Sequence, residues 1–166
     1  MTISAWSIRL VVLASALTTS IAAYAGDLPN AIYTSGAADP AVTQDNLHTT
    51  VCVPGYTKTV RPPVAYTNRL KRQQLDTNYQ GRGDMQSVQE DHLIPLVIGG
   101  SPSDVRNLWP QRREGDRGAG FKDRCEVAAG KALCRGRISL SEAQQGFSAN
   151  WIEWCEALLT HLKASQ

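Results

Sequence analysis

Apolar residues recur with helical spacing in the last third of the chain. Intervals of four, three and four residues place four of them on one helix face: Phe121, Cys125, Ala128 and Ala132. Gly136 is a natural end for this helix. The spacing of Ser139 and Glu142 is that of a capping box, which predicts a second helix through Phe147. A last helix is predicted over residues 150–163, with one apolar side made of Trp151, Trp154 or Cys155, Leu158 and Leu162.

The patterns before residue 88 are weaker. Residues 26–44 are rich in Ala, Pro, Gly, Ser and Thr and predict an arm or loop. Residues 50–53 predict a short strand, and the Arg-Pro-Pro stretch at 61–63 predicts extended backbone. A short basic helix is expected over residues 67–75, capped by its first residue, a threonine. Residues 77–85 show no periodicity and predict a loop.

Candidate chemistry is concentrated between residues 88 and 123. Glu90, Asp91 and His92 lie among apolar residues, and the pattern up to residue 123 predicts a strand, a loop, a short strand and a helix. A carboxylate beside an imidazole suits metal-assisted phosphodiester hydrolysis. The carboxylate holds a hard divalent cation, and the neutral imidazole takes a proton from the attacking water. Neighbours on a flat strand point to opposite faces, so the pair can converge only at a strand end or a distortion.

Residues 1–25 have the pattern of a secretory signal peptide. Arg9 precedes an uncharged, mostly apolar stretch of 14 residues, Leu10 to Ala23. The stretch is shorter than a membrane span of about 20 residues. Ala23-Tyr24-Ala25 is a small-x-small cleavage site. The expected location is periplasmic or extracellular, without stable membrane association after cleavage. An uncleaved anchor is the alternative.

Four cysteines follow this segment: Cys52, Cys125, Cys134 and Cys155. An even number in an exported chain predicts two disulfides, and the absence of C-x-x-C pairs argues against structural zinc. Cys125 and Cys134 lie nine residues apart on the predicted helix. That separation is about 13 Å along the helix axis, which is too far for a disulfide. Of the two remaining pairings we favour Cys52–Cys134 with Cys125–Cys155, which sets the apolar stripe against the last helix.

The composition is that of a globular domain. Of 166 residues, 42% are hydrophobic and 19% charged, which argues against a disordered, collagen-like or coiled-coil chain. Residues 26–166 are enough for a single domain. Their net charge is +1, yet the segments 58–82 and 106–137 each carry +5. Such segregation can form a phosphate-binding face, and the alternative is a solvated surface.

The central segment resembles the HNH endonucleases, whose core is the ββα-metal, or His-Me, finger. The resemblance rests on Asp91-His92-x-x-Pro95-Leu96-x-x-Gly99-Gly100 followed by Asn107-Leu108, and it covers about residues 88–130. Flanking stretches are similar to those of small exported bacterial proteins with this finger: Arg61-Pro62-Pro63, residues 66–71, Asn107 to Pro110, Lys122-Asp123, and Ala143-Gln144 ahead of Trp151. The expected fold class is α+β, with a small ββα-metal finger core, additional C-terminal helices and stabilising disulfides.

The resemblance implies roles for three residues. His92 is expected to be the general base that activates water, and Asp91 the first metal ligand. Asn107 is expected to fix the loop between the strands and to help orient His92. The family also supplies a His or Asn from the start of the helix, but here Gly118 and Ala119 stand near that position.

A carboxylate is the expected substitute for that missing ligand. Asp123 is the first choice, because a carboxylate one turn into the helix is a proper oxygen ligand. Asp116 and Glu126 are the alternatives, and Asp123 also fits a solvated helix position. Such an all-oxygen site favours one Mg²⁺ or Mn²⁺ ion over Zn²⁺.

These features together predict an exported, monomeric HNH-type endonuclease that hydrolyses phosphodiester bonds in DNA or RNA. Six cations of the two basic segments are the expected phosphate contacts: Arg69, Lys71, Arg72, Arg112, Arg113 and Arg117. The alternative is an exported, non-catalytic module that binds polyanions or nucleic acid and keeps a degenerate HNH finger as a scaffold.

Overall fold

The computed structural model describes residues 26–164, so the predicted signal peptide lies outside the described residues. The helices are α1 (Tyr56–Val60), α2 (Val64–Asp76), α3 (Ala119–Cys134) and α4 (Leu140–Ala164). Two strands, β1 (Val88–His92) and β2 (Leu108–Arg112), form one antiparallel pair. Short 3-10 helices are η2 (Gln44–Thr49), η3 (Leu96–Ile98) and η4 (Val105–Asn107). The described chain is therefore α+β, as predicted.

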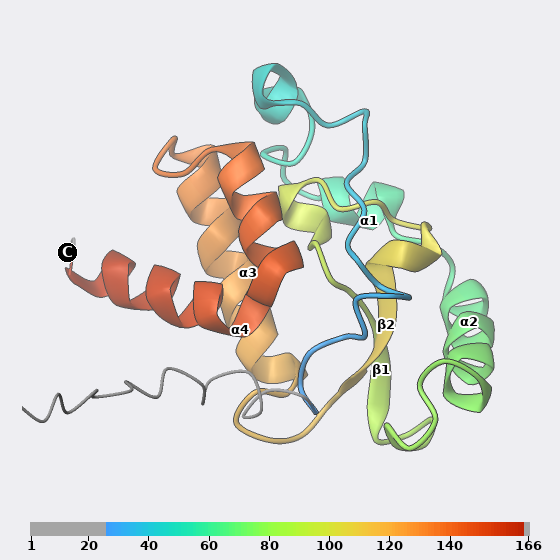
Figure 1. Cartoon of the computed structure of the whole chain (residues 1–166). Coiled ribbons are helices and arrows are strands. Elements are labelled where there is room, and N and C mark those ends of the chain that lie inside the picture. Colours follow the sequence, from blue (N-terminus) through green and yellow to red (C-terminus); the bar gives the residue numbers. More distant parts are fainter. Residues whose placement is uncertain (1–25, 165–166) are drawn as a thin grey trace, which may run out of the picture.

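The strand pair occupies the middle of the molecule (Figure 1). Helix α2 packs against one side of it, and α3 with α4 lies on the other. Asp91 is paired with Trp109, so their side chains share the face toward α3 and α4. Glu90 and His92 alternate to the face toward α2. The predicted order of strand, loop, strand and helix is confirmed for β1, β2 and α3.

The hydrophobic core lies between α3, α4 and the strand pair. Trp109, Phe147, Trp151 and Ile152 are completely buried in it. Helix α4 changes direction at Asn150, whose backbone is non-helical. Its two halves correspond to the two helices predicted through residue 147 and over 150–163. The predicted capping box is also present, since Glu142 N–H donates to Ser139 Oγ at 3.1 Å.

Two expectations for the N-terminal half are wrong. Residues 50–53 form turns and not a strand, because Cys52 N–H and Val53 N–H donate to the nearby carbonyls of Leu47 and Thr50. Helix α2 starts at Val64, three residues earlier than expected, directly after a proline that needs no hydrogen-bond partner for its nitrogen. Residues 61–63 are non-helical and 77–85 form a loop, as predicted.

The predicted disulfide pairing is confirmed. Cys52 is bonded to Cys134 and Cys125 to Cys155, each with a Cα–Cα distance of 5.6 Å. The second bond joins α3 to α4 inside the core, and no described cysteine is free. Two disulfides are consistent with an oxidising, extracytoplasmic compartment. Between residues 26 and 164, no helix is long and apolar enough to cross a membrane.

Candidate functional site

His92 is the last residue of β1 and directly follows Asp91. Its Nε2 lies 3.0 Å from the carbonyl oxygen of Pro102. A carbonyl only accepts, so Nε2 carries the hydrogen and Nδ1 keeps the lone pair. Burial lowers the pKa of His92, despite the opposing effects of the Pro102 carbonyl and Asp91. The imidazole is therefore neutral at pH 7, which is the form that accepts a proton.

Asn107 closes the loop between the two strands. Its Oδ1 accepts from Ile94 N–H at 2.8 Å, and its Nδ2 donates to the carbonyls of Ile94 and Ser101 at 3.0 and 2.9 Å. The amide is completely buried. Gly100 is required beside it, because a Cβ there would lie 1.8 Å from the carbonyl oxygen of Ile94. The Gly-Gly and Asn positions thus act together to shape the loop after His92.

Asp91 is held by a buried lysine from α3. Lys122 Nζ lies 2.8 Å from Asp91 Oδ2, 2.6 Å from the carbonyl oxygen of His92 and 2.5 Å from Glu126 Oε1. The side chain of Lys122 is completely buried, and its ammonium lies 5.6 Å from the centre of the Phe147 ring. Burial would lower the pKa of Lys122, but the two carboxylates outweigh it and raise the pKa. The ammonium stays charged, with three acceptors for its three hydrogens.

Two further carboxylates border this ion pair. Burial raises the pKa of Glu126 to about 7, against the attraction of Lys122. Burial and then the charge of Asp91 raise the pKa of Asp123, which lies on the exposed side of the first turns of α3. The three carboxylates are therefore close enough for mutual repulsion, and negative charge accumulates at this end of α3.

Arg61 belongs to the same cluster. It follows α1 in the extended Arg-Pro-Pro stretch and is exposed. Its positive charge lowers the pKa of both His92 and Asp123, which places it near both groups. An exposed cation next to a neutral imidazole is well placed to attract a phosphate.

Sequence reasoning missed Lys122 and Arg61 as site residues. Lys122 precedes Cys125 and Ala129 by three and seven residues, so a stripe drawn through Cys125 and Ala129 would have put this lysine on the buried face. Arg61 belongs to the Arg-Pro-Pro stretch noted in the sequence, but that stretch gave it no role, since the approach of residue 61 to residue 92 depends on tertiary packing.

Glu90 is a second buried carboxyl group, on the α2 side of the strand pair. Neither of its oxygens has a hydrogen-bond partner among the described residues. Burial and the neighbouring Asp91 raise its pKa to about 8, while Lys71 opposes the shift. Glu90 is therefore mostly protonated at pH 7.

The six expected phosphate contacts differ in their exposure and in their partners. Lys71 is buried and donates to the carbonyls of Met85 and Val88 at 2.8 and 3.1 Å, so it does not remain in this set. Arg117 pairs with Glu156 at 3.2 Å. The other four are exposed: Arg69, Arg72, Arg112 and Arg113.

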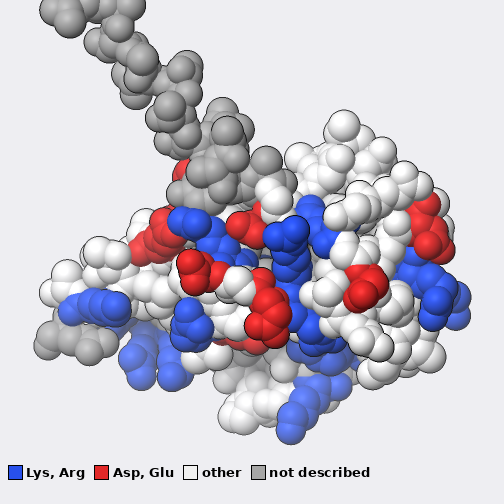
Figure 2. All heavy atoms as spheres, turned by 90° about the horizontal axis from the view of Figure 1, so that it is seen from below, with Lys and Arg blue, Asp and Glu red and all other residues white. Residues whose placement is uncertain are grey.

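Near the middle of the face drawn in Figure 2, red carboxylate residues lie beside blue basic ones, so this face carries charges of both signs.

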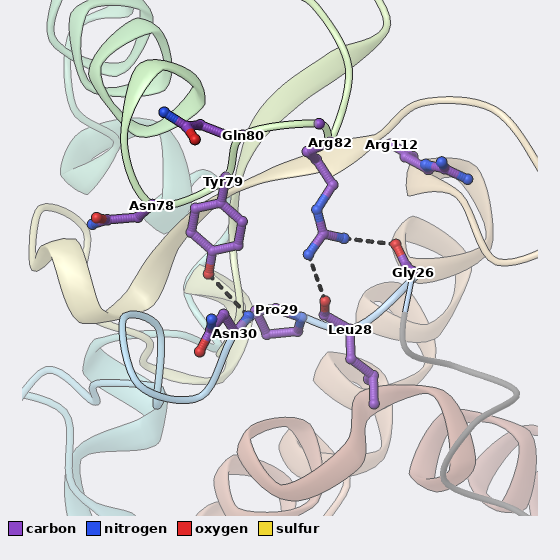
Figure 3. A pocket seen from close by; sticks show the side chains of 10 residues that line it. Gly26, Leu28, Pro29, Asn30, Asn78, Tyr79, Gln80, Arg82 and Arg112 are labelled. Carbon is purple, nitrogen blue, oxygen red and sulfur yellow. Dashed lines mark hydrogen bonds between the residues drawn. The ribbon is translucent and has the colours of Figure 1, made fainter.

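A cavity of about 430 Å³ lies away from this cluster, beside the N-terminal arm. Figure 3 shows how Arg82 enters it and donates to the carbonyls of Gly26 and Leu28, both at 2.7 Å. Tyr79 accepts from Asn30 N–H at 3.1 Å. These polar groups are already used to hold the arm against the 77–85 loop, so the cavity has a structural explanation.

Among residues 26–164, no group of three or more His, Cys, Asp or Glu side chains is arranged to hold a metal ion. The helix residue that reaches Asp91 is Lys122, while Asp123 lies beside the pair and Asp116 is exposed in the loop before α3. Comparison with models of known families, with curated proteins and with solved structures finds no match to this chain.

Proposed function

We propose that this protein is an exported, metal-dependent endonuclease of the HNH type that hydrolyses phosphodiester bonds in DNA or RNA. The observation that carries the proposal is the state of His92. A neutral imidazole whose Nε2 is fixed by a backbone carbonyl presents an oriented lone pair on Nδ1. The order β1, β2, α3, with the Asn107-bound loop after His92, supports a ββα-metal finger as the scaffold of the site.

Two carboxylates near His92 offer oxygen ligands of the kind that one hard divalent cation takes. Asp91 has a second carboxylate oxygen beyond the one bonded to Lys122, and Asp123 lies close enough for its pKa to be raised by Asp91. Carboxylate oxygens are the ligands that Mg²⁺ and Mn²⁺ prefer. When bound, the ion would neutralise charge on the phosphate and on the departing oxygen.

The chain's own residues divide the remaining work. His92 Nδ1 takes a proton from the attacking water, and Pro102 holds the ring in that orientation. Arg61 attracts the phosphate toward the imidazole. Lys122 fixes the Asp91 carboxylate and the backbone of His92 relative to α3.

Nicking of supercoiled plasmid by the exported protein tests this function. The wild type is expected to nick DNA, or to cleave an RNA of similar length, with Mg²⁺ or Mn²⁺ and to stop with EDTA. His92→Ala should lose cleavage and keep its helical circular dichroism, since the ring donates only to one carbonyl. The exposed Gln145→Ala serves as the control and should cleave normally. Equal nicking by His92→Ala and the wild type would remove the assignment.

The ion pair of Lys122 favours a second candidate function. Lys122 already neutralises part of Asp91, and the residues from 26 to 164 contain no ready-made three-ligand cluster. A non-catalytic module that binds polyanions on a degenerate finger would have these features. Binding of plasmid without cleavage, with any of Mg²⁺, Mn²⁺ or Zn²⁺, would support this alternative.

A further inference from the structure

A basic groove runs between the second half of α3 and the end of α4, and we call it the α3–α4 groove. Its volume is about 340 Å³. Its rim carries five cations: Arg124, Lys131, Arg135, Arg137 and Lys163. Aliphatic side chains, including Val127 and Leu162, also line the groove, and Val127 is 55% exposed.

The rim charges of this groove are not compensated. No Asp or Glu lines the groove, and none of its five cations takes part in an ion pair within residues 26–164. Arg124 donates to a carbonyl of its own helix and lies over the Phe121 ring. Like charges that line one groove repel one another, so an anion bound between them relieves an unfavourable interaction.

The α3–α4 groove is separate from the cluster around His92. Lys131 lies nine residues after Lys122, which is two and a half helical turns at about 3.6 residues per turn. Lys131 and Lys122 therefore project from opposite sides of α3, one exposed and the other completely buried. A ligand in the groove does not touch Asp91 or His92.

We propose that the α3–α4 groove binds the phosphate backbone of a nucleic-acid strand, as a second binding position outside the site of cleavage. The proposal rests on the proposed function for the identity of the polyanion. The side chains that line the groove are either cationic or aliphatic, so the groove contacts phosphates and packs against sugars without selecting a base sequence.

Salt-dependent binding of a fluorescein-labelled single-stranded 15-mer tests this proposal. The measurement uses the exported protein carrying His92→Ala, so that cleavage does not consume the probe. Lys131→Gln/Arg135→Gln removes two rim charges from exposed positions. Thr49→Glu/Gln145→Glu is the control, because it lowers the net charge equally at exposed positions outside the groove.

The groove variant should bind about tenfold or more weakly at low salt, and the slope of log affinity against log salt should fall by about 1.4 for two lost contacts. The control should change affinity less than twofold. Equal behaviour of the two variants, or no binding of the probe by the His92→Ala protein, overturns the proposal.

The outcome also separates this proposal from the nuclease function. If the groove binds the probe as expected but the wild type cleaves nothing, the nuclease assignment fails and the groove proposal stands. If the wild type cleaves while the groove variant binds normally, only the groove fails.

Discussion

Asp91 and Lys122 form an ion pair of 2.8 Å that joins the end of β1 to the first turns of α3. The lysine side chain is completely inaccessible to solvent, whereas the aspartate side chain is 14% exposed. The same ammonium donates to the backbone of His92. The candidate base, the candidate metal ligand and the helix are thereby connected through one charged group. A buried ammonium of this kind is strongly destabilising unless every hydrogen is bonded.

Replacement of Lys122 by methionine should be severe. Lys122→Met keeps the length and apolar character of the stem but leaves Asp91 and Glu126 facing each other without a cation. Breaking a buried pair in this way costs about 3–5 kcal/mol of unfolding free energy, and urea denaturation measures it. Lys122→Met/Glu126→Gln removes one of the repelling carboxylates and should recover part of the loss. A single variant as stable as the wild type would contradict the structural role of the ammonium.

Asn107→Ala should loosen the loop after His92. The change removes the hydrogen-bond partner of the Ile94 N–H and of the carbonyls of Ile94 and Ser101, around an amide that is completely buried. Unsatisfied buried groups predict a loss of about 2–4 kcal/mol in denaturant titrations. Asn68→Ala, at an exposed position of α2, should stay within about 0.5 kcal/mol and is the control.

The disulfide Cys52–Cys134 should contribute strongly to stability, because its cysteines are 82 residues apart. Loss of the chain constraint predicts a cost of about 4–5 kcal/mol for Cys52→Ser/Cys134→Ser. The single variant Cys52→Ser breaks the same bond and should lose a similar amount. Thiol titration of the denatured, unreduced exported protein should find no free cysteine. Four free thiols in that sample would refute both disulfides.

Asp123 and Glu126 should differ in their effect on metal dependence. Glu126 Oε1 already accepts from Lys122, whereas Asp123 is exposed and close to Asp91. Asp123→Asn should raise the Mg²⁺ concentration needed for half-maximal cleavage about tenfold or more, and weaken Mn²⁺ binding measured by electron paramagnetic resonance. Glu126→Gln should change both much less. Zn²⁺ should support cleavage poorly, because both proposed ligands are carboxylates. Unchanged Mn²⁺ binding by Asp123→Asn would exclude this residue as a ligand.

Much of the fold follows from local patterns. The apolar stripe from Phe121, the capping box at Ser139 and the apolar side of residues 150–163 predict the helices because side-chain periodicity and capping act within a few residues. Helix geometry also excludes a bond between Cys125 and Cys134, which leaves two disulfide pairings. The structure contains the favoured one of these two, which sets the apolar stripe of α3 against α4.

Tertiary structure decided which charged residues became buried. Lysine is a residue type usually found on the surface, yet Lys71 and Lys122 are buried. Both donate to interior acceptors from other segments of the chain. Residues 50–53 have strand-forming side chains, but they pair with neither β1 nor β2, and turns satisfy their backbone. By itself the sequence determined the order of the strands and the C-terminal helices and the Asp91-His92 pair, and it reduced the disulfide pairings to two. The approach of Lys122 and Arg61 to that pair required packing, because a charge enters a core only where its partners have already been brought together.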